Sequence, residues 1–202
     1  MELADLCLGR TGRSLRHSLC RFETYRPYQI IMTPELKALE DNSQSIISEC
    51  MAVSFRMKNS PPEYIDTFSV GCKELIFQNM KKSSTYVAKQ IPTTWDLYSK
   101  IPHAGRTALR KIIAGGYIMA HSGPHMGEEP CYRAHFTIQS NEDAFMLVGG
   151  VRLNWVPGKW LFFDDNVEHS AYNNGNSDRI VLVTSLPKSH YRLTNNTIEY
   201  KL

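Results

Sequence analysis

The chain lacks the long apolar runs that mark membrane-spanning and secreted proteins. No stretch of its 202 residues approaches the roughly 18 consecutive apolar residues that a membrane-spanning helix requires. The N-terminus also lacks the apolar core of a secretion signal. Residues 7–26 are rich in Arg and Ser, but Glu2 and Asp5 disfavour a transit peptide. We therefore expect neither a membrane protein nor a secreted one.

Cysteine is scarce and follows no known framework. The five cysteines are odd in number, widely scattered and without a CxxC pair: Cys7, Cys20, Cys50, Cys72 and Cys131. This pattern excludes a zinc ribbon and a disulfide scaffold. A reducing intracellular setting, the cytoplasm, is the simplest fit.

Clustered positive charge is also missing. The formal net charge is only +3, and much of the positive charge lies in five arginines between residues 10 and 26. Because nucleic-acid binding needs Lys and Arg gathered on one surface, we expect no nucleic-acid partner. The hydrophobic share of 42% and the charged share of 21% are ordinary for a soluble globular protein. The length suits one domain.

The first half of the chain has helical patterning. We expect residues 1–26 to form a flexible arm and residues 27–202 to form the domain. Thr33-Pro34-Glu35 is a strong helix start, and apolar residues at helical spacing predict an amphipathic helix over about residues 34–52. A second short helix is expected to begin at Pro92 and end near Pro102.

After residue 110 the sequence pattern changes. Short apolar runs are separated by turn-forming pairs such as Gly115-Gly116 and Pro157-Gly158. Short strands with turn signals at this spacing indicate a β-sandwich or barrel. The expected architecture is a helical layer over about residues 33–110 that covers a β-barrel over about residues 111–186. The expected strands are 111–114, 117–120, 135–138, 144–148, 160–163 and 180–184.

Three of the seven histidines, His121, His135 and His169, lie at or beside these strands. Iron(II) oxygenases commonly hold the metal with two histidines and one carboxylate, which leaves positions open for cosubstrate and oxygen. Neither His121 nor His135 has a carboxylate two residues later. Glu168 adjoins His169 on a strand, so its side chain should point to the opposite face.

These residues also have structural interpretations. A single histidine near a strand is more often a hydrogen-bonded core or surface residue than a metal ligand. The carboxylates of Asp164 and Asp165 suit a turn in which they cap backbone N–H groups, although either could support a metal site. Arg179, at the start of a predicted strand, suits a salt bridge.

Four motifs of the C-terminal half occur together: HSGP (His121–Pro124), RAH (Arg133–His135), WVPGKWLFFDDNVEH (Trp155–His169), and Arg179 ten residues after the last histidine. HSGP alone is weak, whereas the third motif with its late arginine is specific. On these motifs the chain resembles the aspartyl/asparaginyl β-hydroxylase family of Fe(II)/2-oxoglutarate dioxygenases. The likeness extends more weakly upstream and covers most of residues 34–186.

The resemblance implies a mainly β protein with N-terminal helices and a double-stranded β-helix core, a jelly roll of the cupin-like kind. It also implies a metal-binding site in which two histidines alone hold the iron. The matching positions are His121 and His169, while Gly123 falls where the wider superfamily places its carboxylate. His135 stays open as an alternative ligand to His121.

The same resemblance implies a clamp for the cosubstrate, 2-oxoglutarate. Arg179 would pair with its far carboxylate, while Arg133 and His135 would hold its near end; a guanidinium suits a carboxylate because it bonds bidentately. The chain departs from the family in three places. Three extra residues lie around 125–129, and the family's cosubstrate-binding serine falls near Arg110, which is not a serine. The cysteine pair that closes a loop in the animal endoplasmic-reticulum members is missing from residues 83–100.

The implied activity is an oxidoreductase reaction. Oxygen and 2-oxoglutarate are consumed, succinate and CO₂ are released, and an unactivated carbon is hydroxylated. The expected substrate is the Cβ of an aspartyl or asparaginyl residue in a peptide or protein. Two alternatives stay open: a free or carrier-bound amino acid or other small molecule as the substrate, and a non-catalytic barrel that binds a carboxylate.

Overall fold

The structure is a computed structural model that describes residues 31–54, 57–59, 69–79, 82–83, 89–123, 129–194 and 197–201. The expected N-terminal arm lies outside the described residues. The elements in chain order are α1 (Pro34–Asp41), α2 (Ser43–Val53), β1 (Lys58–Asn59), β2 (Ser69–Asn79), β3 (Lys82–Ser83), α5 (Pro92–Tyr98), β4 (Thr107–His121), β5 (Cys131–Gln139), β6 (Ala144–Val148), β7 (Val151–Asn154), β8 (Trp160–Asp164), β9 (His169–Asn173), β10 (Arg179–Pro187), β11 (Tyr191–Leu193) and β12 (Ile198–Tyr200).

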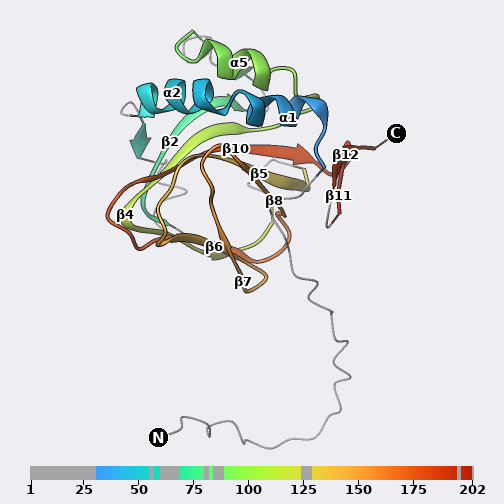
Figure 1. The fold of residues 1–202 in the computed structure, drawn as a ribbon. Coiled ribbons are helices and arrows are strands. Elements are labelled where there is room, and N and C mark those ends of the chain that lie inside the picture. The colour runs from blue at the N-terminus through green and yellow to red at the C-terminus, as the bar shows by residue number, and fades with distance from the viewer. Residues whose placement is uncertain are drawn as a thin grey trace, which may run out of the picture.

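The long strand β4 joins the two walls of the β-structure. Its first half pairs with β2 and β10, and its second half pairs with β9. The strand order β7-β6-β9-β4-β10-β5-β8 therefore runs through β4 from one wall to the other. Figure 1 shows the resulting curled sheet. The expectation of a mainly β jelly roll with N-terminal helices is confirmed.

Two glycines lie where β4 passes from one wall to the other. Gly115 has a φ of +75°, a left-handed conformation that glycine adopts without a steric cost. At Gly116 an added Cβ would lie 2.8 Å from both Ile112 Cγ2 and the Val70 carbonyl oxygen. Only a residue without a side chain fits there, because the neighbouring backbone is in close contact.

The helices α1, α2 and α5 lie on the outer face of the wall that contains β5 and β10 (Figure 1). Alternation along β8 separates two cores. Trp160 and Phe162 pack in the cluster beneath the helices, whereas Leu161 and Phe163 pack in the cluster inside the barrel. None of the helices that the structure describes has the length and apolar character needed to cross a membrane.

The helix expected over residues 34–52 is two helices. Asn42 separates them with a non-helical φ of −106° and ψ of 20°, and its side-chain amide donates to the Ala38 carbonyl at 2.8 Å. The Glu40 carboxylate, in the last turn of α1, accepts from Lys159 Nζ at 3.0 Å and from the Trp160 amide at 3.2 Å. The direction of α1 is thus set by contacts with β8. The helix predicted at Pro92 is confirmed as α5.

The expected strand 144–148 is β6 with the same bounds, and the strands expected at 135–138, 160–163 and 180–184 are confirmed with longer bounds as β5, β8 and β10. The two runs expected at 111–114 and 117–120 are one strand, β4. The strand β2 lies within the segment expected to be a helical layer. The prediction did not include β7 and β9, and β9 carries His169.

Candidate active site

His121 and His169 are direct neighbours across two strands. His121 ends β4 and pairs with His169, which begins β9, just beyond a register shift in the ladder. Their ring centroids are 4.2 Å apart, and the ring planes differ by 56°. Both side chains line one pocket.

Both rings are oriented by a carbonyl two residues upstream. The Nδ1 of His121 lies 2.8 Å from the Met119 oxygen, and the Nδ1 of His169 lies 2.8 Å from the Val167 oxygen. Because a carbonyl only accepts, the hydrogen-bond network assigns a proton to Nδ1 in each ring. The lone pair then resides on Nε2, as in metal-binding histidines whose other ring nitrogen donates to a backbone carbonyl.

His169 is kept neutral. Burial first, and also the nearby His121, lower its pKa to about 4, against the opposing effects of the bond to the Val167 carbonyl and of the Asp165 charge. A neutral imidazole is the form that binds a metal ion.

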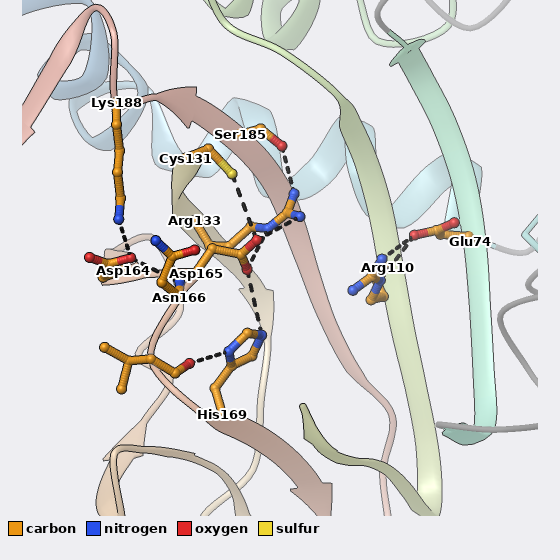
Figure 2. A network of polar contacts seen from close by, with 11 residues as sticks. Glu74, Arg110, Cys131, Arg133, Asp164, Asp165, Asn166, His169, Ser185 and Lys188 are labelled. Carbon is orange, nitrogen blue, oxygen red and sulfur yellow. Dashed lines mark hydrogen bonds and ion pairs between the residues drawn. The ribbon is translucent and has the colours of Figure 1, made fainter. Parts of the chain in front are cut away.

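Asp165 links this histidine to a buried arginine. Its two oxygens accept from Arg133 Nε at 2.9 Å and Nη2 at 3.1 Å, while Arg133 Nη1 donates to Ser185 Oγ at 2.6 Å (Figure 2). Asp165 Oδ1 also lies 3.6 Å from His169 Nε2. The negative charge next to the histidine is therefore balanced by Arg133.

The adjacent Asp164 has a different role. It lies half-buried at the end of β8, where it pairs with Lys188 at 2.6 Å and accepts from the Asn166 amide at 2.9 Å. These contacts stabilise the turn after β8 (Figure 2). Of the two carboxylates that the sequence offered for this site, only Asp165 faces the histidines.

Arg179 is a fully buried cation with unsatisfied donors. Its guanidinium stacks on Trp155, with Cζ 3.6 Å from the ring centroid, and its Nη2 lies 3.4 Å from His135 Nδ1. Its Nε and Nη1 have no hydrogen-bond partner within the described parts of the chain. Burial, followed by the nearby charge of Arg110, lowers the pKa of Arg179 well below its ordinary value. A buried unpaired charge is costly, so this position favours an anion.

His135 lies beside Arg179 and is also neutral. Burial first, and then the charge of Arg179, lower the pKa of His135 well below its ordinary value. Its ring meets Phe163 edge-on at 5.2 Å. His135 can therefore accept a hydrogen bond from Arg179 or donate one to a ligand, depending on its tautomer.

All five residues singled out from the sequence line one pocket of about 410 Å³, its open mouth included. Four strands supply them: β4, β5, β9 and β10. Apolar side chains complete the walls. The five residues are His121, Arg133, His135, His169 and Arg179.

Two residues outside the five predicted ones also line or contact the pocket. The sequence named Arg110 only as the place of the family's cosubstrate-binding serine, and it gave Trp155 no role in the site. Arg110 lines the pocket from β4, and Trp155 carries the guanidinium of Arg179 on its ring. The signal for Arg110 is the register of β4 and β10, which sets it opposite Val181, two residues from Arg179 on the same face. That register cannot be read before the pairing of the strands is known.

Within the described residues no group of three His, Cys, Asp or Glu side chains forms a metal site. The pocket thus combines a pair of neutral histidines with a buried, unmatched arginine, inside a jelly roll. In fold, the chain is similar to a prolyl-4-hydroxylase from Pseudomonas putida, with a TM-score of 0.51 and 11% identity over 73% of this chain and 86% of that one. Fold and site together define the class: a double-stranded β-helix whose pocket holds a histidine pair and a buried arginine.

The family follows from the sequence itself. The model of the aspartyl/asparaginyl β-hydroxylase family matches residues 40–188, well over half of the chain. This chain belongs to that family. A curated relative from Rhizobium tropici, an ornithine lipid ester-linked acyl 2-hydroxylase, is 30% identical over 100 residues, which are 50% of this chain and 36% of the relative. The match thus spans about a third of that relative's length.

Proposed function

We propose that the chain is an Fe(II)- and 2-oxoglutarate-dependent dioxygenase in which His121 and His169 bind the iron and Arg179 binds the far carboxylate of 2-oxoglutarate. One observation carries the proposal. Arg179 is 1% exposed and keeps Nε and Nη1 without a partner among the described residues, in the same pocket as the histidine pair. A dicarboxylate held between a metal and this arginine would supply the missing anion.

The residues fit an iron ion of this kind. Both histidines are oriented by carbonyls so that Nε2 carries the lone pair, and imidazole nitrogen suits iron. When bound, iron and 2-oxoglutarate together supply the activation of oxygen, which no side chain of this pocket can perform. The protein's contribution is to bind, orient and exclude water.

Specific roles follow for the remaining residues. We assign His135 to the near end of 2-oxoglutarate, since its neutral ring lies beside Arg179 and lines the same pocket as the histidine pair. Arg133 lines the same pocket and fixes Asp165 next to His169. We assign it to the near end as well, where its charge favours a carboxylate, while its bonds to Asp165 hold the wall behind His169 in place.

The proposed reaction is hydroxylation of an unactivated carbon. The family description supports the Cβ of an aspartyl or asparaginyl residue in a peptide or protein as the substrate. The described cysteines, Cys50, Cys72 and Cys131, are buried thiols, which supports a reducing compartment such as the cytoplasm.

A second candidate substrate is an acyl chain. The Rhizobium tropici relative is named as an acyl 2-hydroxylase of an ornithine lipid. In this chain, the residues two positions before the histidines are apolar and exposed: Met119 by 50% and Val167 by 38%. Exposed apolar side chains close to the histidines favour contact with an apolar substrate.

The cofactor assignment is tested under anaerobic conditions. Fe(II) and 2-oxoglutarate added to the protein should produce the weak visible charge-transfer band of a chelated complex. His121→Ala and His169→Ala should abolish the band and the bound iron, whereas His135→Ala should keep iron and weaken 2-oxoglutarate. His190→Ala, on the far stack with His103, is the matched control. Iron retained in His121→Ala and lost in His135→Ala would contradict the ligand assignment.

The substrate is tested by coupled turnover under air. Aspartyl and asparaginyl peptides, the free amino acids, and acyl-ornithine lipids are each incubated with the iron-loaded protein, and succinate and the hydroxylated product are measured. A peptide hydroxylase gives product only with the peptides. Product from the lipid alone would establish the second candidate.

A further inference from the structure

The outer surface of the wall formed by β4, β6, β7 and β9 is not covered by any helix that the structure describes. The helices α1, α2 and α5 lie on the opposite wall, which contains β5 and β10 (Figure 1). An antiparallel sheet that faces water usually carries polar side chains on that side. If water were the natural neighbour of this surface, its side chains should therefore be polar.

A row of apolar and aromatic side chains instead crosses four strands of this surface. Val70 on β2 pairs with Tyr117 on β4, and Tyr117 pairs with Tyr172 on β9. Tyr172 then pairs with Phe145 on β6, and the two rings stack at a centroid distance of 5.2 Å. Val70 and Tyr117 are exposed by 50% and 37%, and the other two side chains are half-buried. We call these four residues the aromatic row.

The aromatic row faces outward because the next residues along the same strands face inward. Ile118, Met146 and Ala171 pack in the apolar cluster inside the barrel, and successive side chains on a strand alternate between the two faces. The aromatic row is thus outside both cores of the described chain. Contiguous exposed apolar side chains of this kind mark an interaction surface.

A second row of less bulky side chains lies beside the first. Leu147 follows Phe145 by two residues on β6 and shares its face; it pairs with Ser170 on β9 and with Arg152 on β7. The Arg152 guanidinium lies over the Phe145 ring, 4.0 Å from its centroid, and Nε donates to Asn154 Oδ1 at 3.3 Å. The single charge of the two rows is therefore held at their β7 end.

The charges at the margin of this face favour a protein partner. The exposed charged residues that flank β6 and β9 are all acidic: Glu142, Asp143 and Glu168. Anionic membranes and nucleic acids bind clusters of Lys and Arg, whereas the two rows hold one arginine among the described residues. Tyr, Phe and Arg are the residue types enriched in protein–protein interfaces, from which Lys, Glu and Asp are depleted.

We propose that this outer face is the interface of a symmetric dimer, in which a second copy of the chain covers the two rows. A two-fold axis that runs between the rows would set the aromatic row of each copy on the second row of the other. Phe145 would then face Leu147, and Tyr172 would face the small Ser170. Arg152 would face the Asn154 amide, so the two Arg152 charges are kept apart.

The size of the face sets the expected affinity. Five strands at a spacing of about 4.8 Å give a face about 19 Å wide. This is small for a permanent dimer, so a dissociation constant in the micromolar range is expected. The inference uses neither iron nor cosubstrate, and it is tested without them.

The experiment is sedimentation of the full chain in the analytical ultracentrifuge from about 1 to 200 µM. Tyr117→Lys and Phe145→Lys each place a charge in the interface, and by symmetry each charge occurs twice per dimer. Met51→Lys is the matched control, because Met51 is 38% exposed on α2. Thermal unfolding checks the fold, and Tyr117→Ser removes a ring without adding a charge, in case a lysine variant does not fold.

Wild-type protein should change from monomer to dimer with a Kd of about 1–50 µM. Tyr117→Lys and Phe145→Lys should raise this Kd by about thirtyfold or more, because each buries unpaired charges. Tyr117→Ser should raise it by about fivefold or more, since an interface tyrosine is lost. Met51→Lys should leave it within about twofold of wild type.

Three results would overturn the dimer: a wild-type monomer at every concentration, a Kd that the three face variants leave unchanged, or an equal loss in Met51→Lys. Phosphatidylcholine vesicles test the other occupant. A monomeric wild-type chain that binds these vesicles, and loses this binding in Tyr117→Lys, would assign the face to a lipid surface. The charge-transfer band tests the proposed function separately, so either proposal can fail alone.

Discussion

Arg179 and Arg133 are two buried arginines in one pocket with opposite electrostatic situations. Arg133 is matched by the carboxylate of Asp165, with which it forms two hydrogen bonds. Arg179 has an aromatic ring and a neutral histidine beside it, but no carboxylate bonds it within the described chain. The same residue type thus stabilises the fold at one position and costs free energy at the other.

Replacing each arginine by Met should separate these situations. Arg179→Met should raise the free energy of unfolding of the ligand-free protein by about 1–3 kcal/mol, because an unmatched buried charge is removed. Arg133→Met should lower it by about 3–5 kcal/mol, because Asp165 is left buried and unpaired. Urea denaturation measures both values. Equal destabilisation by the two variants would contradict the electrostatic assignment.

His135 should make the stability of the metal-free protein depend on pH. Its pKa lies well below the ordinary 6.5 in the folded protein. Below pH 6.5 the unfolded chain therefore binds a proton at this residue that the folded protein does not bind. The free energy of unfolding is therefore highest above pH 6.5 and falls as the pH is lowered below it, by up to about 1.4 kcal/mol per pH unit for one proton.

Urea denaturation of chelator-treated protein at several pH values measures this slope. His135→Gln, which does not titrate, should flatten it. His169 remains in the variant and contributes down to its pKa of about 4, so a residual slope is expected. A slope identical to that of wild type would show that His135 is protonated in the fold.

At the scale of single elements, β4 has the greatest influence on the site. It contributes Arg110 before the glycine pair and His121 after it. The change of pairing partner from β10 to β9 lies between these residues. The relative positions of Arg110 and His121 in the pocket therefore depend on the bend at Gly115 and Gly116.

Alanine at the two glycines should have unequal effects. Gly115→Ala meets no atom within 4 Å and carries only the cost of its φ of +75°, about 1–2 kcal/mol. Gly116→Ala overlaps a carbonyl oxygen at 2.8 Å, so the strand must shift, at a cost of about 1–3 kcal/mol. Iron affinity, measured by anaerobic titration, should fall in Gly116→Ala and stay within about twofold in Gly115→Ala. Equal iron affinities would show that the bend does not position His121.

Sequence patterns predicted the elements whose structure depends mainly on their own residues and not on distant pairing partners. The strand 144–148 has clear apolar content between turn residues and was predicted with correct bounds. By contrast, β9 has the sequence HSAYN, which has little apolar periodicity and is a strand because β4 and β6 pair with it on both sides. The helix break at Asn42 likewise depends on distant contacts, those of Glu40 with β8.

For the site, the sequence motifs predicted the five residues that line the pocket together. They did not predict a place in the pocket for Arg110, whose contribution depends on strand register. Nor did they separate Asp164 from Asp165, since the sequence alone does not show which of two adjacent aspartates faces the pocket. Asp164 ends β8 and is partly exposed, whereas Asp165, the first residue of the following turn, is buried and faces Arg133.

At the scale of the whole molecule, the wall formed by β5, β8 and β10 separates two apolar clusters. The cluster under the helices anchors α1 through Trp160, whose Nε1 donates to the Leu36 carbonyl at 2.9 Å. The inner cluster surrounds the pocket and includes Phe163, whose ring lies 4.8 Å from that of His169. Substitutions on the outer face of β8 should therefore change mainly stability, and substitutions on its inner face should change mainly ligand binding.

Two substitutions on β8 test this separation. Trp160→Phe should lower the free energy of unfolding by about 1–3 kcal/mol through the lost hydrogen bond and volume, with the Kd for 2-oxoglutarate within about twofold of wild type. Phe163→Leu should weaken 2-oxoglutarate or iron binding more than Trp160→Phe does. Denaturation and calorimetry on both variants give the comparison. Weaker binding in Trp160→Phe than in Phe163→Leu would contradict it.

The adjacency of His121 and His169 on β4 and β9 has a kinetic consequence. An ion bound by residues of two paired strands can be released when the hydrogen bonds between those two strands break. Iron dissociation should then be governed by local opening of the β4–β9 ladder and not by global unfolding. Amide hydrogen exchange along this ladder should slow when metal binds, while exchange in β5 and β8 stays unchanged.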